Sequence, residues 1–204
     1  MSEPLSTAQT CDAQNLAARL RCGEAALFPT DTLPALAAQP ASAALLWELK
    51  QRPQHKPVIL MAATAEELWT CLGQPIKPEW RKLAEQHWPG GLTLVLPAKG
   101  AVLQQLNPGG SSLGLRVPNC SAALELLQAS GPLATTSANR SGEPPCLTAE
   151  AAMAAFPGIG ILQPTPWPPP SGQASTVLAW RQEGGWQLLR QGAVMPELVL
   201  QANA

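Results

Sequence analysis

The chain has 204 residues, of which 46% are hydrophobic and 13% are charged. This length and apolar content are sufficient to bury a substantial core, and they exclude a largely disordered chain. Thirteen Lys and Arg against fourteen Asp and Glu give a formal net charge of −1, which argues against a protein that coats nucleic acid through its overall charge. A local basic cleft is still compatible with this composition.

The sequence shows no signal peptide, no membrane-spanning segment and no metal-binding motif. The first twenty residues lack the order of charged, apolar and small residues that defines a signal peptide, and no apolar run reaches membrane-spanning length. We therefore expect a cytoplasmic protein without membrane contact. We also expect no protein-bound metal site, because the cysteines are too far apart for a zinc or redox motif: Cys11, Cys22, Cys71, Cys120 and Cys146.

The predicted elements alternate between helix and strand. In chain order we expect a helix at 12–21, a strand at 25–28, a helix from Ser42, a strand at 58–62, a helix after Thr64, a helix from Pro78 to about Trp88, a strand at 92–96, a glycine-rich loop at 99–112, a strand at 113–117, a helix capped by Asn119 and ending at Gln128, a strand at 133–136, a helix after Thr148, and a final hairpin of strands 176–180 and 186–189. This alternation predicts an α/β fold with one domain at 10–195 and terminal tails at 1–9 and 196–204.

Two features refine this outline. The inner face of the helix from Ser42 is predicted to be Leu45, Leu46 and Leu49. The segment 164–171 contains five prolines, so it cannot be regular structure, and we interpret it as a loop that passes near the functional site.

A basic cluster follows the helix from Ser42. Lys50, Arg52 and Lys56 are three cations within seven residues, and His55 lies among them. A lysine can bind a polyphosphate as a point charge and an arginine as a planar, bidentate donor. The same cations would also suit the solvent-exposed C-terminus of a helix, so this cluster alone does not decide the function.

A polar loop follows the strand at 133–136. Ser137, Asn139 and Ser141 present hydroxyl and amide groups there, together with backbone N–H groups that can bind an anion. An ordinary Ser/Asn turn has a similar composition.

Further polar residues occur at strand ends. These are Thr30, Asp31, Thr32, Arg116, Ser175 and Arg190. In open α/β sheets the ends of strands converge on ligand crevices, so we expect these residues to share one site with the basic cluster and the polar loop.

Taken in order, these motifs resemble the YrdC/TsaC family. The resemblance rests on Pro29-Thr30-Asp31-Thr32, Lys50-Gln51-Arg52-Pro53, Trp88-Pro89-Gly90-Gly91-Leu92-Thr93, Leu115-Arg116-Val117-Pro118, Thr136-Ser137-Ala138-Asn139-Arg140-Ser141-Gly142, Ser175-Thr176-Val177 and Leu189-Arg190-Gln191-Gly192. The succession of seven motifs is far more specific than any one of them. It implies a YrdC-like twisted sheet, mixed or parallel, with flanking helices around a basic cavity.

The resemblance also implies an activity. The family condenses L-threonine, bicarbonate and ATP into threonylcarbamoyl-AMP and pyrophosphate, for modification of the tRNA adenosine next to the anticodon. Mg²⁺ would accompany ATP, downstream threonylcarbamoyl-transferase proteins would receive the product, and contact with tRNA is compatible with this role.

Roles for individual residues follow from the same resemblance. Lys50, Arg52, Ser137 and Asn139 would hold the phosphates and the reacting carbamate and are the expected catalytic residues. Ser141 and Arg190 would also contact the nucleotide. Thr30, Thr32, Arg116 and Ser175 would surround threonine.

The sequence departs from the family pattern at three places. Leu33-Pro34-Ala35-Leu36 stands where many relatives have an aromatic residue and glycine, Gly91 replaces a frequent proline, and the proline-rich 164–172 replaces an acidic, glycine-containing stretch. Three alternatives therefore stay open: a non-catalytic RNA-binding or ribosome-assembly module, a carbamoyl-adenylate-forming domain of the hydrogenase-maturation type, and a divergent relative without threonine specificity.

Overall fold

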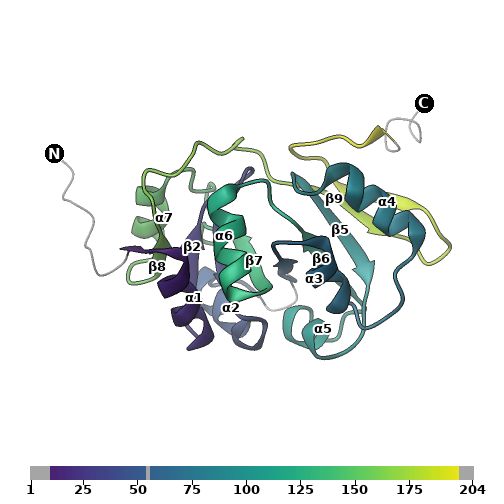
Figure 1. Cartoon of the computed structure of the whole chain (residues 1–204), viewed down its shortest axis with the longest axis horizontal. Coiled ribbons are helices and arrows are strands. Elements are labelled where there is room, and N and C mark those ends of the chain that lie inside the picture. Colours follow the sequence, from purple (N-terminus) through teal and green to yellow (C-terminus); the bar gives the residue numbers. More distant parts are fainter. Residues whose placement is uncertain (1–9, 54–55, 198–204) are drawn as a thin grey trace.

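The computed structural model describes residues 10–53 and 56–197. Its described strands form one twisted ten-stranded sheet in the order β1-β8-β2-β3-β7-β4-β6-β5-β9-β10 (Figure 1). The strands are β1 (Thr10–Cys11), β2 (Ala26–Phe28), β3 (Ala35–Ala38), β4 (Ile59–Met61), β5 (Leu92–Pro97), β6 (Ser112–Arg116), β7 (Leu133–Ser137), β8 (Gly160–Leu162), β9 (Thr176–Trp180) and β10 (Trp186–Arg190). The sheet contains both parallel and antiparallel strand pairs, which confirms the predicted mixed α/β class.

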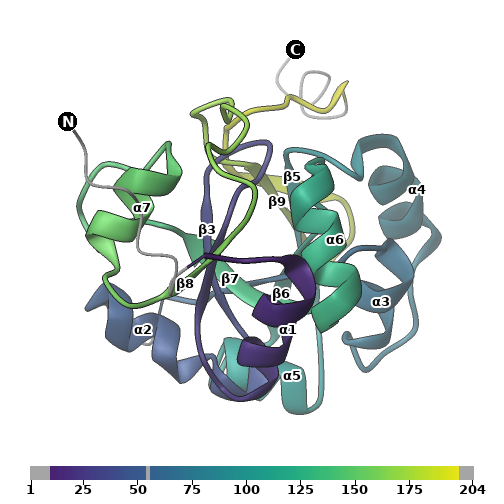
Figure 2. The ribbon, with the colours of Figure 1, turned by 60° about the vertical axis from the view of Figure 1, so that its left-hand side comes forward.

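Helices pack on both faces of this sheet (Figures 1 and 2). They are α1 (Ala13–Arg21), α2 (Ala44–Lys50) after the short 3-10 turn η1 (Pro40–Ser42), α3 (Ala65–Thr70), α4 (Pro78–His87), α5 (Ala101–Leu106), α6 (Ser121–Ser130) and α7 (Ala149–Ala155).

One face of the sheet carries the larger core. A continuous row of paired residues crosses the central strands on this face: Leu178, Leu94, Leu115, Leu60, Ala134 and Ala38. All six are buried, and side chains of α2, α3, α4, α5 and α7 belong to the same apolar cluster. Because alternate residues of a strand point to opposite faces, the residues directly before and after each member of this row point to the other face of the sheet.

The other face is covered only in part. Leu16 and Leu20 of α1 and Leu126 and Leu127 of α6 pack there over the strands at the β1 side of the sheet, in a cluster that reaches Met61 of β4. Beyond Met61 the same face continues with Arg116, which pairs with Met61 in register. The change from apolar to polar side chains marks where the helical layer ends and the site begins.

Most predicted elements are confirmed. Asp12 and Thr148 accept hydrogen bonds from the first turns of α1 and α7, and Thr64 and Glu67 form the predicted capping box of α3. The final hairpin is present as β9 and β10.

Two local predictions are wrong and a third is confirmed only in part. The loop expected at 99–112 contains α5, whose Leu103 and Leu106 are buried against the core. The N-cap of α6 is Cys120, because the backbone N–H of Asn119 donates to Asp31 Oδ1 at 3.0 Å. The inner face predicted for α2 is confirmed in part: Leu46 is buried, Leu45 and Leu49 are half-buried against the same core, and Trp47 and Lys50 are buried as well.

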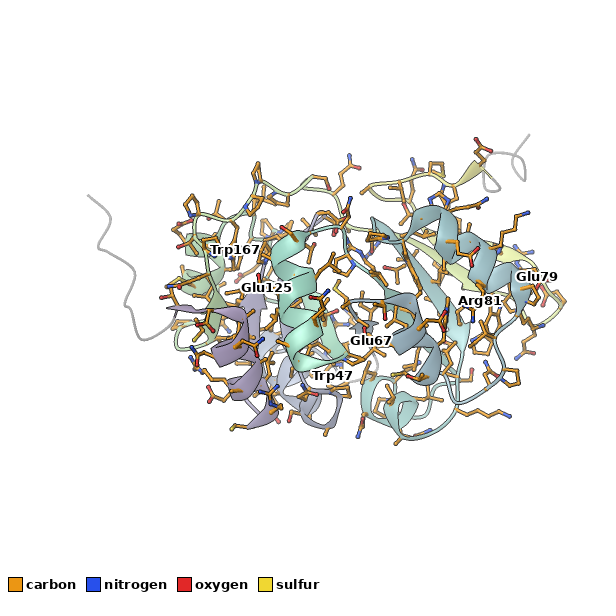
Figure 3. The ribbon with its side chains drawn as sticks, viewed as in Figure 1. Trp47, Glu67, Glu79, Arg81, Glu125 and Trp167 are labelled. Carbon is orange, nitrogen blue, oxygen red and sulfur yellow. The ribbon has the colours of Figure 1, made fainter. Side chains whose placement is uncertain are left out.

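The proline-rich segment 163–175 connects the two ends of the sheet. It runs from β8 across the molecule to β9 along the top of Figure 1. Trp167 anchors its first half through a hydrogen bond of 2.8 Å from Nε1 to the carbonyl oxygen of Leu162, on the side of the molecule that carries α7 (Figure 3). We call this segment the strap.

None of the described helices is long and apolar enough to cross a membrane. The single domain expected at 10–195 stays a prediction. His55 and the residues beyond Glu197 lie outside the described part of the chain.

Candidate active site

A cavity of about 240 Å³ opens on the partly covered face of the sheet. It is lined by Thr32, Leu33, Ala35, Arg52, Pro57, Val58, Ile59, Met61, Arg116, Thr135, Thr136, Ser137, Ala174, Ser175 and Arg190. Three arginines and no acidic residue belong to this described lining, so the cavity is basic, as the resemblance implies. A larger groove of about 680 Å³ along α4 contains none of the residues predicted for the site.

Lys50 connects the Lys50-Gln51-Arg52-Pro53 motif to the polar loop that carries Ser137 and Asn139. It is the last residue of α2 and is buried, and its Nζ donates to the carbonyl oxygens of Ser137, at 2.5 Å, and of Asn139, and to Asn139 Oδ1 at 3.2 Å. Burial, together with the nearby charge of Arg52, lowers the pKa of Lys50 to about 8. The three oxygens act in the opposite sense, because they accept hydrogen bonds from the ammonium form.

The polar loop after β7 is therefore shaped by its own side chains. Asn139 Oδ1 also accepts from Ser137 Oγ at 2.6 Å, while Asn139 Nδ2 donates to the carbonyl oxygens of Arg140 and Glu143. The backbone N–H of Ser141 donates to the carbonyl oxygen of Lys50 at 3.2 Å, and the residue itself is exposed. These bonds hold Ser137 at the cavity wall.

Arg52 reaches the cavity from the segment after α2. Its Nη1 donates to Thr136 Oγ1 at 3.1 Å, and its Nη2 donates to the carbonyl oxygens of Lys56 and Pro57. Its Nε is buried without a partner. Burial lowers the pKa of Arg52, but a guanidinium stays charged at neutral pH. All of its described partners are neutral oxygens, so its positive charge is available to an anion.

Arg116 lies at the end of β6 and is buried. Its Nε donates to the carbonyl oxygen of Gly90 at 2.9 Å, its Nη1 to Thr32 Oγ1 at 2.6 Å, and its Nη2 to Asp31 Oδ1 at 2.6 Å. Burial lowers its pKa, and the adjacent carboxylate of Asp31 partly offsets that effect. The fork of Arg116 thus joins the turn after β2 to the segment before β5.

Ser175 and Arg190 complete the opposite wall. Arg190 donates from Nε and Nη2 to the carbonyl oxygen of Ser175, at 3.1 and 2.9 Å, and from Nη2 to Ser175 Oγ at 3.2 Å. Ser175 Oγ also lies 2.8 Å from Thr93 Oγ1. Arg190 is exposed as a whole residue, but its guanidinium is partly shielded from water, and this desolvation lowers its pKa.

The structure brings most of the predicted residues to this cavity. Thr32, Arg52, Arg116, Ser137, Ser175 and Arg190 line it. Lys50 and Asn139 bond to the loop that carries Ser137, and Ser141 follows on the same loop. Thr30 does not line the cavity, but its Oγ1 lies 3.2 Å from Thr32 Oγ1 and donates to the carbonyl oxygen of Leu33 at 2.8 Å. The roles of these residues toward substrate stay predictions.

Sequence reasoning missed part of the lining. Ile59 and Met61 were expected only as buried strand residues, and Ala35 was noticed only as a departure from the family pattern; all three line the cavity. The signal that could have identified Ile59 and Met61 is alternation, because they flank core residue Leu60 and must point to the opposite face.

This arrangement suits a reaction that depends on positioning and charge. The described lining offers guanidinium groups and hydroxyls, and it contains no His, Cys, Lys, Asp or Glu that would act as nucleophile or general base. Transfer of a phosphoryl or nucleotidyl group needs neutralisation of phosphate charge and alignment of the reactants more than a protein nucleophile.

Comparisons with known proteins agree with this geometry. The model of the Sua5/YciO/YrdC family, described as "Telomere recombination", matches residues 18–192. Threonylcarbamoyl-AMP synthase of Bacillus subtilis is 36% identical over 155 residues, which are 74% of this chain and 44% of that protein. Threonylcarbamoyl-AMP synthase of Klebsiella pneumoniae is 37% identical over 134 residues, which are 63% of this chain and 70% of that protein.

A solved structure gives the same result. The crystal structure of Pyrococcus abyssi Sua5 complexed with L-threonine superposes with a TM-score of 0.84 at 32% sequence identity, covering 93% of this chain and 56% of that one. This chain therefore spans about half the length of the Bacillus and Pyrococcus relatives and more than two thirds of the Klebsiella relative. On the family match, the fold and the order of the site motifs, the chain belongs to the Sua5/YciO/YrdC family.

Proposed function

We propose that this chain is a threonylcarbamoyl-AMP synthase, a nucleotidyltransferase that uses L-threonine, bicarbonate and ATP. The observation that carries the proposal is the convergence of Arg52, Arg116, Ser137, Ser175 and Arg190 on one basic cavity in a chain whose curated relatives have that name. The Pyrococcus relative with bound L-threonine supports the choice of amino acid.

The proposed reaction has two steps. The threonine nitrogen attacks the carbon of bicarbonate with loss of water and gives N-carboxythreonine. A carboxylate oxygen of this carbamate then attacks the α-phosphorus of ATP, the bond to the bridging oxygen of the β-phosphate breaks, and pyrophosphate leaves. The products are threonylcarbamoyl-AMP and pyrophosphate.

The cavity residues would act by binding and alignment. Arg52 and Arg190 face the cavity with only neutral described partners, so they are the natural ligands of the ATP phosphates. Lys50 and Asn139 would keep the loop that carries Ser137 in shape beside the reacting carbamate. Arg116, Thr32 and Ser175 would hold threonine. A cavity of about 240 Å³ suits the small amino acid, with the nucleotide extending toward the open side.

Mg²⁺ fits this site only as a companion of ATP. Among the described residues, no group of three or more His, Cys, Asp or Glu side chains could hold a metal ion. Mg²⁺ in nucleotide sites is frequently held by phosphate oxygens and water, and there it neutralises phosphate charge. We propose the same here, with no dedicated protein ligands.

The product would serve tRNA modification. We propose that downstream threonylcarbamoyl-transferase proteins receive the adenylate and transfer its threonylcarbamoyl group to the tRNA adenosine next to the anticodon, in the cytoplasm, where ATP and tRNA occur together.

Pyrophosphate release tests the proposal directly. The purified chain is incubated with ATP, Mg²⁺, bicarbonate and each amino acid in turn, and pyrophosphate is measured together with the adenylate product by mass spectrometry. Release that requires both bicarbonate and L-threonine is the expected result. Binding of ATP without threonine-dependent release would contradict the synthase function, and release with another amino acid would contradict the proposed substrate.

A further inference from the structure

The three arginines of the cavity differ in their hydrogen-bond partners, because one of them pairs with a carboxylate. In the described chain the salt bridge of Arg116 with Asp31, at 2.6 Å, is the single arginine–carboxylate pair at the cavity, because Arg52 and Arg190 donate only to hydroxyl and carbonyl oxygens. The Arg116 side chain is 3% exposed and that of Asp31 is 20% exposed. A guanidinium this deeply buried requires a paired charge or complete hydrogen bonding, and Asp31 supplies the charge.

Asp31 also determines where the fork of Arg116 points. Arg116 donates three hydrogen bonds: from Nη2 to Asp31 Oδ1, from Nη1 to the adjacent Thr32 Oγ1, and from Nε to the carbonyl oxygen of Gly90. The carboxylate is itself fixed by the backbone N–H of Asn119 at 3.0 Å. Three acceptors from two segments thus hold the guanidinium plane in one orientation.

The same turn secures the strap. The carbonyl oxygens of Asp31 and Thr32 accept from the backbone N–H groups of Ser171 and Gly172, at 3.0 and 3.2 Å. Four residues after Ser171, the strap ends at Ser175, which also lines the cavity. The Asp31-Thr32 turn therefore links Arg116 to the segment that carries Ser175.

We propose that Asp31 is a positioning residue for the amino-acid side of the site. It holds Arg116 in place and neutralises part of its charge, so that Arg116 serves the amino-acid substrate. Arg52 and Arg190, which have no acidic partner among the described residues, serve the phosphates. This inference rests on the proposed function for the identity of the two substrates, but the orientation of Arg116 by Asp31 can be tested without it.

The kinetic test compares Asp31→Asn, Asp31→Glu and a matched control, Glu66→Gln. The control removes the carboxylate of a different arginine–carboxylate pair, Arg81 of α4 with Glu66 of α3, and neither residue lines the cavity. Loss of a charge-assisted hydrogen bond to Arg116 should raise the KM for L-threonine roughly 10- to 100-fold in Asp31→Asn, with the KM for ATP changed less than about threefold. Asp31→Glu should recover part of the loss, and Glu66→Gln should match the wild type.

Other outcomes overturn the proposal. An equal rise in both KM values would show a general structural role for Asp31, and unchanged kinetics in Asp31→Asn would show that Arg116 needs no carboxylate partner. A fall in kcat without the KM split would equally contradict the division between amino acid and phosphate.

A second measurement keeps the test independent of activity. In ¹H–¹⁵N spectra of the arginine side chains, the Nη2–H that Arg116 donates to Asp31, assigned by its loss in Arg116→Lys, should be protected from exchange in the wild type and lose protection in Asp31→Asn. Unchanged protection would refute the positioning role. If the wild type releases no pyrophosphate but Asp31→Asn still loses this protection, the proposed function is refuted and the positioning role of Asp31 is not.

Discussion

The Nζ of Lys50 lies 2.5 Å from the carbonyl oxygen of Ser137, so the end of α2 and the loop after β7, 87 positions apart in the chain, are joined by a direct hydrogen bond. The pairing explains why a Lys-x-Arg motif and a Ser-x-Asn motif occur together in one site. Lys50 holds the loop after β7 by hydrogen bonds, and Arg52, two residues later, lines the cavity itself. One motif thus supplies both the support of the site and part of its binding surface.

Replacement of Asn139 by alanine should strongly reduce activity while the fold survives. The amide of Asn139 bonds to Ser137 Oγ, Lys50 Nζ and two carbonyl oxygens, so its loss frees the loop that presents Ser137. We expect pyrophosphate release to fall by about 10²- to 10³-fold, the range typical for loss of a preorganised polar group.

Asn107→Ala is the matched control for this variant. Asn107 also donates from its Nδ2 to a carbonyl oxygen, that of Ser112 at 2.9 Å, but it does not line the cavity. It should keep near wild-type turnover, with circular dichroism used to verify folding of both proteins. Equal turnover in the two variants would contradict the role of Asn139.

Replacement of Arg52 by lysine should also impair the enzyme, although the charge is kept. The planar fork of Arg52 spans Thr136 on one side and the Lys56 and Pro57 carbonyls on the other, and a lysine cannot reproduce that geometry. The KM for ATP should rise at least about tenfold.

The surface residue Arg81 provides the comparison. Arg81 of α4 (Figure 3) pairs with Glu66 of α3 at the exposed surface, so Arg81→Lys should leave the KM for ATP unchanged. A normal KM for ATP in Arg52→Lys would mean that charge alone, and not the fork, is what the nucleotide requires.

Much of this site could be predicted because polar residues at strand ends are visible in the sequence. Arg116 and Ser175 stand beside apolar runs in the sequence, and both line the cavity, which forms where these strand ends meet. The succession of motifs then identified the family, which short-range patterns could not do.

The remaining features depend on contacts between distant segments. The direction of the Lys50 side chain is decided by the carbonyl oxygens of a loop on another strand, and the pairing of Asp31 with Arg116 joins residues 85 positions apart. The helix α5 escaped prediction because its short apolar stretch lies among glycines, and it is stabilised by burial of Leu103 and Leu106 more than by local propensity.

Leu94→Ala should destabilise the protein far more than Leu189→Ala. Leu94 of β5 is fully buried in the row of paired residues that crosses the sheet, between Leu178 and Leu115, while Leu189 of β10 is 53% exposed. Removing the buried side chain leaves a cavity and should cost about 2–5 kcal/mol of unfolding free energy, whereas the exposed replacement should cost less than about 0.5 kcal/mol. Urea unfolding followed by tryptophan fluorescence measures both; similar losses would contradict the assigned core.

The buried Lys50 predicts a pH-dependent stability. Its pKa is lowered from 10.5 to about 8 in the folded chain, mainly by burial. Between these two values the unfolded chain keeps the Lys50 proton while the folded chain has released it, so the unfolded state binds more protons and stability rises with pH. The difference in unfolding free energy between wild type and Lys50→Met should therefore grow in favour of the wild type from pH 8 to 10.5, by on the order of 3 kcal/mol.

Taking the difference between the two proteins removes the titration of the other lysines and cysteines, which both share. Lys50→Arg serves as a second reference, because a guanidinium stays charged through this range and cannot release its proton on folding. Measured against either variant, the relative stability of the wild type should be constant below about pH 7 and increase above pH 8. A constant difference over the whole range would show that the three oxygens around Nζ hold the ammonium charged as firmly as water does, and that burial does not lower its pKa.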